Sequence, residues 1–368
     1  MAVAVTTAST STAPQRAVNT VSVSRKSFLL ASLLVPAGLA VSACGSSSSG
    51  SGSPSATTGG DTGSLSVTHA FGTTEVPGVV ERIACVNWGN HDVPLALGIM
   101  PVGMAKQTWG VEDDSGMLPW TKEKVDELVA DGAQAPELFD ETDAIAFEAV
   151  AATTPDVILA AYSGLTQEDY DTLSKIAPTI AYPTVAWGTP WREMITMDAT
   201  GMRRTADGEA LVAELDTLIT DSLADYPQLA GKTSAFFYLD PTDTSTIGFY
   251  TTADPRTAFL SDLGMAVPPS VQTASDADPD TFYVTVASEN ADTLNDVDLM
   301  VCYGQADTLA TLQADPRLGT IPAIKNGAVA MVGDATPLAA STNPGPLSLP
   351  WGLAQYLELI GAAADKVQ

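Results

Sequence analysis

The sequence predicts an α/β protein with two lobes, each a mainly parallel sheet flanked by helices, and a long helix that joins them. From about residue 65, short apolar or β-branched runs alternate with amphipathic stretches. This alternation is typical of parallel sheets covered on both faces. It stops near residue 191, where only helical spacing is found, and it resumes near residue 235. The interruption separates the two predicted lobes.

The first lobe is predicted over residues 65–190. Proline and glycine mark its turns: Gly98 and Pro101 precede one short strand, and Pro155 precedes another. The expected strands cover residues 83–87, 102–105, 157–161 and 179–182. The expected helices cover residues 91–97, 144–152 and 167–176.

Residues 191–226 are predicted to form the interlobe helix, because Leu211, Leu215 and Leu218 recur at helical spacing and little turn chemistry interrupts them. The second lobe is predicted over residues 227–368, with a final helix near residues 347–362. Its expected strands cover residues 235–239, 247–250, 283–286, 299–303 and 328–332.

The charge balance excludes one large class of functions. The chain has 44 Asp and Glu against 16 Lys and Arg, a formal net charge of −28. Such a surface repels phosphate backbones, so we expect no nucleic-acid partner. A hydrophobic share of 45% is ordinary for a folded protein. Two His and three Cys exclude most His-rich metal centres and any dense disulfide framework.

Residues 1–43 have the layout of an export signal. They carry three cations and no acid, which leaves 13 cations and 44 acids, a net −31, in the remaining chain. The apolar stretch at residues 28–41 is shorter than the roughly 20 residues that span a bilayer. The end of the segment, Val-Ser-Ala-Cys44, resembles the lipobox of bacterial lipoproteins, and that resemblance implies cleavage before Cys44 and lipidation of its thiol. A plain secretion signal is the alternative, and the choice between twin-arginine and general export stays open.

Residues 44–64 are expected to be a flexible tether. Fourteen of the 20 residues after Cys44 are Gly or Ser, so the segment has no side chains with which to build a core. The expected location is therefore the cell membrane, with the folded part lipid-anchored on its extracytoplasmic face.

Several landmarks of the folded part resemble one family. They are Arg-Ile-Ala-Cys at 82–85, Pro-Asp-Val-Ile-Leu at 155–159, Ile-Ala-Pro-Thr at 176–179 and Ile-Pro-Ala-Ile-Lys-Asn-Gly at 321–327. In this order they resemble the substrate-binding lipoproteins of iron-siderophore ABC transporters, from about residue 65 to the C-terminus. The resemblance implies a monomeric bilobal protein with a rigid interlobe helix, which captures a ferric siderophore and delivers it to an ABC permease.

The resemblance also implies one exposed glutamate per lobe that docks on the permease. By position these are Glu148, just before the Pro-Asp strand, and Glu289, its counterpart in the second lobe. The alternative is that each carboxylate merely stabilises the N-terminus of its own helix, which contributes about 0.3–1 kcal/mol.

The ligand is expected beyond the carboxyl ends of the strands, where open α/β sheets bind their ligands. Aromatic and cationic residues follow the predicted strands at these positions of the sequence. The candidates for ligand binding are Trp88, His91, Lys106, Trp109, Tyr162, Trp187, Trp191, Tyr250, Arg256 and Tyr303. A ferric siderophore suits this set, because the chelate is partly apolar and is held by stacking, hydrogen bonds and cations. Capping of the core is the alternative role for each aromatic residue.

No protein-bound metal and no cofactor are expected, since iron would arrive already chelated and few His are available for a metal site. Cys85 and Cys302 lie in apolar strands of different lobes and are expected to be buried free thiols.

Two other functions stay open. Haem or a corrinoid would fit the same scaffold, with His91 or Tyr250 as a ligand to haem iron. An exported enzyme is the second alternative, but the sequence has no nucleophile elbow, phosphate-binding loop or zinc-protease helix, so we expect no catalytic residues.

Overall fold

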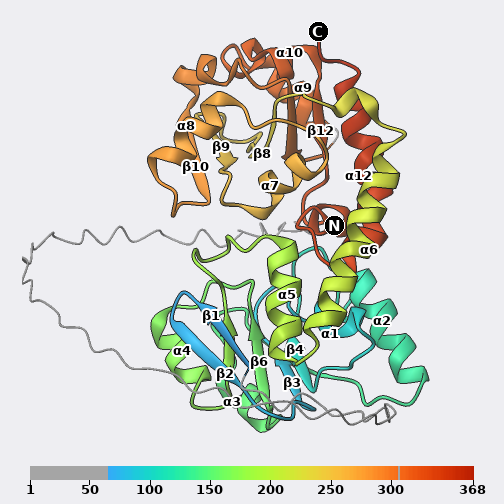
Figure 1. Ribbon diagram of the computed structural model, residues 1–368. Coiled ribbons are helices and arrows are strands. Elements are labelled where there is room, and N and C mark those ends of the chain that lie inside the picture. Colours follow the sequence, from blue (N-terminus) through green and yellow to red (C-terminus); the bar gives the residue numbers. More distant parts are fainter. Residues whose placement is uncertain (1–64, 306) are drawn as a thin grey trace, which may run out of the picture. The chain divides into compact units, whose positions relative to one another are not determined.

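The computed structural model describes residues 65–305 and 307–368, which contain two five-stranded sheets and one two-stranded sheet (Figure 1). The two larger sheets lie in two α/β lobes, so the fold class predicted from the sequence is confirmed. The export signal, Cys44 and the tether lie outside the described residues. Among the helices of the described residues, none is long and apolar enough to cross a membrane.

The sheet of the first lobe is parallel throughout, with the strand order β5-β4-β3-β6-β7. Its strands are β3 Ile83–Cys85, β4 Gly103–Ala105, β5 Glu137–Phe139, β6 Val157–Ala160 and β7 Thr179–Ala181. All but β5 are buried along their whole length, as expected for apolar strands that are covered on both faces.

Alternate residues of β3 face two different cores. Ile83 and Cys85 pack in the cluster that contains Ile195, while Ala84 packs with Val150 on the other face. The helices of this lobe are α1 Asp92–Ala96, α2 Pro119–Ala130, α3 Phe147–Ala152 and α4 Gln167–Leu173. The period of two along each strand therefore divides the sheet between two layers of helices.

Three elements of the first lobe were missed by the sequence prediction. A hairpin, β1 Leu65–His69 and β2 Gly72–Val76, precedes the sheet, and neither α2 nor β5 was expected. The hairpin is held by polar contacts as well as by packing, since His69 Nε2 lies 2.9 Å from the Thr74 hydroxyl. Thr74 in turn donates to the Thr179 carbonyl at 2.8 Å, which joins the hairpin to β7.

The segment predicted as the interlobe helix, residues 191–226, forms two helices rather than one. They are α5 Trp191–Gly201 and α6 Thr205–Leu223. Arg203 between them has a φ of 59°, in the left-handed region, and this reverses the course of the helical backbone. The leucines at helical spacing all lie in α6, after the break, so their pattern does not reveal it. Beyond the break, α6 packs along the C-terminal helix α12 Ser348–Ala364 (Figure 1).

The sheet of the second lobe is mixed, with the order β10-β9-β8-β11-β12. Strands β8, β11 and β12 are parallel, whereas β9 and β10 add to β8 in antiparallel pairings. The strands are β8 Ser234–Tyr238, β9 Thr246–Tyr250, β10 Tyr283–Ala287, β11 Leu299–Tyr303 and β12 Val329–Met331. The antiparallel half arises because a short connection returns β8 directly into β9, with no helix between them.

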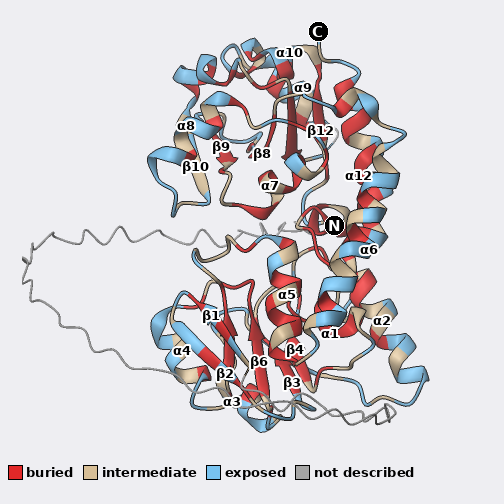
Figure 2. Ribbon diagram, viewed as in Figure 1, coloured by how far each residue is buried: buried red, intermediate tan, exposed pale blue. Residues whose placement is uncertain are grey.

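Helices cover both faces of this second sheet, and the outer helix surfaces are exposed (Figure 2). Strands β8, β9, β11 and β12 are mainly buried, whereas the edge strand β10 has no buried residue. Phe236 of β8 packs towards Phe259 of α7 and Leu353 of α12, whereas Phe237 packs towards Leu312 of α9. The helices are α7 Pro255–Asp262, α8 Pro269–Ala277, α9 Thr308–Ala314, α10 Pro322–Asn326 and α11 Pro337–Ser341, with 3-10 turns at Pro227–Leu229, Ser288–Leu294 and Leu318–Thr320.

The crossing of α5 and α6 generates a testable prediction at Gly208. A Cβ on Gly208 would lie 2.4 Å from the Cβ of Ala199, which is too close for two carbon atoms. Replacing a helical glycine with alanine usually stabilises by about 0.5–1 kcal/mol. Here we expect Gly208→Ala to lower the free energy of unfolding by about 1–3 kcal/mol, because it overpacks the crossing. Denaturant unfolding of the full chain measures the change.

The control is the double variant Gly208→Ala with Ala199→Gly, which moves the methyl group across the interface. It should recover most of the loss, because the two positions share one contact. A stabilising effect of Gly208→Ala alone would show that the close approach of the two helices is not maintained.

Candidate functional site

The carboxyl ends of the strands open onto one pocket of about 440 Å³. Its wall is mainly aromatic, which is typical of sites for small organic ligands. The lining residues are Trp88, Trp109, Tyr162, Trp187, Tyr238, Tyr250, Arg256, Phe282, Tyr303, Asp334, Ala340 and Asn343. Seven of the ten residues predicted from the sequence as ligand contacts are in this set.

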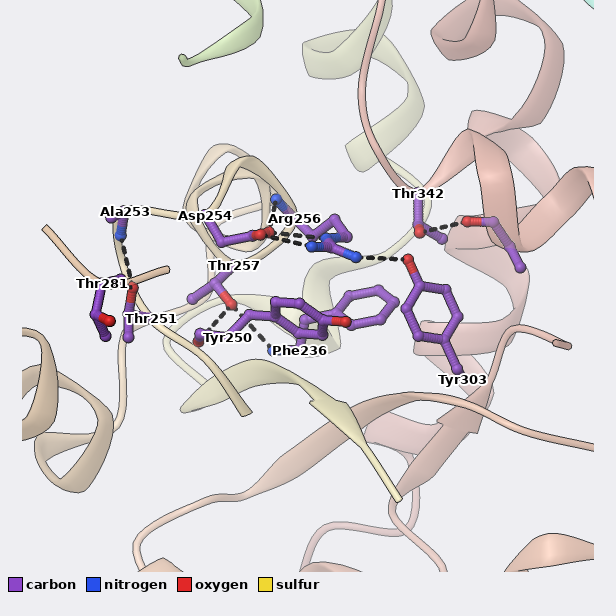
Figure 3. A network of polar contacts seen from close by, with 11 residues as sticks. Phe236, Tyr250, Thr251, Ala253, Asp254, Arg256, Thr257, Thr281, Tyr303 and Thr342 are labelled. Atoms are coloured by element: carbon purple, nitrogen blue, oxygen red, sulfur yellow. Dashed lines mark hydrogen bonds and ion pairs between the residues drawn. The ribbon is translucent and has the colours of Figure 1, made fainter. Parts of the chain in front are cut away.

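Arg256 lies at the centre of the polar network of the pocket (Figure 3). Its Nε and Nη2 donate to the two carboxylate oxygens of Asp254 at 2.8 and 2.6 Å, and its Nη1 donates to the Tyr303 hydroxyl at 2.9 Å. The guanidinium carbon lies 3.7 Å from the centroid of the Tyr250 ring. Two partners in the plane and one ring against its face fix the guanidinium in position.

Asp254 is placed by the start of a helix. It is fully buried, it caps α7, and its carboxylate accepts the backbone N–H of Arg256 at 2.9 Å. Pro255 at the first helical position favours this helix start, since it has no N–H to satisfy. The sequence Asp-Pro-Arg thus builds the helix cap and the ion pair from three consecutive residues.

The aromatic side chains contact one another in a chain around the pocket. Trp109 lies 6.2 Å from Trp88 and 5.4 Å from Tyr303 between ring centroids, and Tyr162 lies 5.4 Å from Trp187. Burial raises the pKa of Tyr162 well above the ordinary value, so its phenol stays protonated and neutral. These rings offer flat apolar faces whose positions are fixed by their neighbours.

Two asparagines position the loops of the first lobe. The fully buried Asn90 side chain donates to the Tyr162 carbonyl at 2.9 Å and accepts the Tyr162 N–H at 2.9 Å. Asn87, with a φ of 61°, accepts the Gly164 N–H and donates to Glu141. These bonds join the loops after β3, β5 and β6. Sequence reasoning missed both asparagines, although an Asn after a strand can indicate a left-handed turn residue.

Trp187 is held in an unfavourable backbone conformation. Its φ is 62°, which is an outlier for a bulky residue, and its N–H donates to the Ser163 carbonyl at 2.9 Å. A Cβ on Gly164 would lie 2.2 Å from the indole nitrogen of Trp187, so only glycine leaves room for the ring. Strain of this kind persists where surrounding contacts impose it and gathers at functional sites.

Three residues predicted as ligand contacts do not line the pocket. Lys106 is exposed, and its side chain passes over Gly116 instead. Trp191 is buried, and its indole N–H donates to Asp262 at 2.9 Å, so it joins α5 to α7. Position after a strand was the signal for both residues, but that position does not determine the direction of the side chain.

His91 is the third of these residues, and it lines a small adjoining cavity of about 20 Å³, which shares Trp88, Tyr162 and Asn343 with the larger pocket. It is 1% exposed, and its Nε2 lies 3.5 Å from Oδ1 of Asp92. Trp120 and Thr121 donate to the Asp92 carboxylate, each at 2.8 Å. Burial lowers the pKa of His91 even though the nearby Asp92 opposes the shift. The imidazole is therefore neutral, and it takes no part in the wall of the larger pocket.

Five residues of the pocket wall were not predicted as contacts. Tyr238 and Phe282, 45% and 36% exposed, are two of the few large apolar side chains that reach the surface in the described residues. Asp334 follows β12 and is exposed, while Ala340 and Asn343 come from the segment around α11. Tyr238 ends a strand, so the rule that found Tyr303 could have found it. Nothing in the local pattern signals Asn343.

The described residues contain no group of three or more His, Cys, Asp or Glu side chains that could hold a metal ion. Cys85 and Cys302 are buried free thiols. The pocket can therefore stack on flat faces and donate hydrogen bonds from Arg256 and the tyrosines, and this chemistry suits a partly apolar organic ligand with oxygen acceptors.

These features define a solute-binding protein of two α/β lobes, and comparison with known proteins agrees. The sequence profile of the periplasmic binding protein family matches residues 83–336. The chain therefore belongs to this family, which confirms the expectation from the sequence.

Two solved structures and one curated relative illustrate the similarity. PiaA of Streptococcus pneumoniae TIGR4, crystallised with ferrichrome, is 44% identical with a TM-score of 0.79, over 83% of this chain and 100% of PiaA. A periplasmic solute binding protein of Mycobacterium smegmatis str. MC2 155 is 25% identical with a TM-score of 0.63, over 83% of this chain and 99% of that protein. A putative ABC transporter substrate-binding lipoprotein of Bacillus subtilis (strain 168), YhfQ, is 32% identical over 120 residues. That match spans 32% of this chain and 32% of YhfQ, about a third of each.

The buried imidazole generates a prediction about pH. Its folded-state pKa lies below the ordinary value of 6.5, so the unfolded chain binds more protons between these two values. The free energy of unfolding is therefore unaffected by this titration above pH 6.5, where His91 is neutral in both states. It decreases as the pH falls below 6.5, because the unfolded chain then gains a proton that the folded chain does not. We expect His91→Leu to remove this loss, so wild type weakens relative to the variant by up to about 1.4 kcal/mol per pH unit.

Denaturant unfolding of both proteins between about pH 5.5 and 7.5 measures the difference. His69 is present in both proteins, so its own titration cancels. A wild type that gains stability relative to His91→Leu on acidification would show instead that His91 is protonated and paired with Asp92.

Proposed function

We propose that this protein is an extracytoplasmic solute-binding lipoprotein that captures a ferric siderophore and delivers it to an ABC-type importer. The observation that carries the proposal is the pocket itself, where three tryptophans and four tyrosines line the wall together with the fixed guanidinium of Arg256. The 44% identity with PiaA, whose structure holds ferrichrome, supports a ligand of the same chemical kind.

Arg256 is suited to bind the oxygen atoms of a chelate. A guanidinium has five N–H groups, and Asp254 and Tyr303 accept only three of those on Arg256. One N–H on each terminal nitrogen is left to donate to the ligand. Since Arg256 lines the pocket, these donors can reach oxygen atoms that coordinate iron, while Trp88, Trp109 and Trp187 contact the organic part.

Export and anchoring are part of the same proposal. The lipobox-like sequence that ends at Cys44 supports a lipid anchor, and the Gly/Ser-rich residues 44–64 support a tether to the folded part. The described lobes then work as a monomer near the membrane surface.

Haem is the main competing ligand, and the positions of its candidate iron ligands argue against it. His91 is 1% exposed and lines the small adjoining cavity, so its imidazole is not part of the wall of the larger pocket. Tyr250 does line the pocket, but burial raises the pKa of its phenol well above the ordinary value. A tyrosinate ligand is therefore costly to form, whereas a neutral phenol can donate a hydrogen bond to a chelate.

Tryptophan fluorescence tests the ligand class directly, because three indoles line the pocket. We expect quenching at micromolar or lower concentration by a ferric trihydroxamate such as ferrichrome, and none by haem or cobalamin. Arg256→Gln should weaken binding of the ferric trihydroxamate about 10- to 100-fold, as expected for lost hydrogen bonds from a charged donor.

The matched control is Lys106→Gln, which removes an exposed cation outside the pocket and should leave the affinity unchanged. Thermal unfolding checks that both variants are folded. Quenching by haem alone, with no response to any ferric siderophore, would contradict the proposed function.

Delivery to a permease is proposed to depend on Glu148 and Glu289. Glu148 lies in the first turn of α3, Glu289 lies in the 3-10 turn after β10, and both side chains are exposed. We expect Glu148→Lys or Glu289→Lys to abolish uptake of the iron complex by cells, with an unchanged affinity for the ligand in solution. Radioiron uptake and fluorescence titration measure the two effects separately.

Glu214→Lys is the control, because it reverses an exposed charge on α6. It should transport normally. If either docking variant loses affinity for the ligand, or transports as well as wild type, the docking role is contradicted.

A further inference from the structure

The charges around the pocket are few and nearly balanced. Among the described residues, the pocket is lined by only two charged side chains, Arg256 and Asp334. Arg256 is not a free cation, since both oxygens of the buried Asp254 accept its hydrogen bonds. The pair sums to zero, and Asp334 then leaves one negative charge on the wall.

Other cations that the sequence might have supplied lie elsewhere. Arg192 is paired with Asp216 and Asp262, with its Nη1 2.8 Å from an oxygen of Asp262. Lys106 lies over Gly116, outside the pocket wall. The rest of the wall is neutral, because burial raises the pKa of Tyr162 and Tyr250 and keeps both phenols protonated.

This distribution matters because ferric chelates differ in charge. Three hydroxamates cancel the charge of ferric iron, three catecholates leave the complex trianionic, and a pendant ammonium on a trihydroxamate makes it cationic. Moving an anionic complex out of water into an aromatic pocket is costly unless cations compensate it. A neutral complex needs only hydrogen-bond donors, and Arg256 supplies these without adding net charge.

We propose that Asp254 acts as a charge filter: by neutralising Arg256 it makes the pocket select neutral or cationic ferric chelates and reject anionic ones. Asp334 adds to the selection at the exposed rim, where it repels anions and attracts a pendant ammonium. This inference rests on the proposed function and names the ligand class within it.

Asp254 has two roles, as the cap of α7 and as the partner of Arg256. Asparagine in its place would keep the cap of α7, because Asn and Asp are comparable N-cap residues. It would keep the size of the side chain but would leave the Arg256 charge uncompensated. The negative charge of Asp254 is therefore not needed for the helix cap, and Asp254→Asn keeps the cap while it removes the charge.

The test uses three iron complexes and the full-length protein. The probes are the ferric complex of a linear trihydroxamate with one free amine, the same complex with that amine acetylated, and a ferric tricatecholate. Wild type should bind the first two at least about 100-fold more tightly than the tricatecholate. Asp254→Asn should lower this preference by about tenfold or more, mainly by improved binding of the anion.

Asp254→Asn leaves a buried arginine unpaired and could unfold, so a rim variant provides an independent test. Asp334→Lys changes only an exposed side chain. It should reduce the affinity ratio between the free amine and its acetylated form by about two- to tenfold, with a smaller effect at high salt. The matched control Asp225→Lys changes the net charge equally at an exposed site after α6 and should leave the ratio unchanged.

The outcomes separate the two proposals. Tricatecholate binding by wild type as tight as that of the acetylated trihydroxamate would overturn the charge filter but leave siderophore binding standing. An unchanged amine-to-acetyl ratio in Asp334→Lys would overturn the role of the rim. Failure of all three complexes to bind would overturn the proposed function, and the filter with it.

Discussion

Parallel strand pairing is the constraint on which the pocket depends. Strands β3 and β6 run parallel, as do β8 and β11, so the loops after each pair reach the same edge of their sheet. Trp88 and Tyr162 follow the first pair, and Tyr238 and Tyr303 end the second. Residues far apart in sequence thereby contribute to one wall. The pocket is thus a consequence of topology, and its chemistry is determined by the residue types at the strand ends.

The two lobes contribute different things to this wall. The loops of the first lobe carry tryptophans, and Asn90 joins two of these loops by bonding both the N–H and the carbonyl of Tyr162. The second lobe contributes the polar centre, Arg256, through the start of α7. The first lobe supplies the three tryptophans, and the second supplies the Arg256 donors together with further aromatic rings, among them Tyr250 and Tyr303. A ligand must fit the side chains of both lobes, so fewer ligands are acceptable than if one lobe alone formed the wall.

The sequence was sufficient to predict the fold class and most of the pocket wall, because both depend on periodicity and on position relative to strand ends. Residues such as Trp109, Tyr250 and Arg256 were found in this way. Side-chain direction was not predictable: Trp191 follows a strand but bonds to Asp262, and His91 lines a small adjoining cavity instead of the pocket.

Other errors have the same physical origin. The break at Arg203 depends on one left-handed residue that helical periodicity does not reveal. The hairpin at β1 and β2 is short, and its two strands bury only alternate residues against the lobe. Asn343 reaches the pocket only because the segment between α11 and α12 packs there. Such features are determined by tertiary packing, which no local pattern encodes.

The acidic surface of the chain and the charge pair beside its pocket act in the same direction on a charged ligand. A net charge of −28 gives a surface that disfavours the approach of anions within the roughly 8–10 Å that salt leaves unscreened. Beside the pocket, the charge of Arg256 is cancelled by that of Asp254. The geometry of this pair leaves N–H donors of Arg256 available to a ligand without adding net charge. If Arg256 were unpaired, the pocket would attract anions that the surface repels. Because Asp254 pairs with Arg256, the pocket and the outer surface both disfavour anionic ligands.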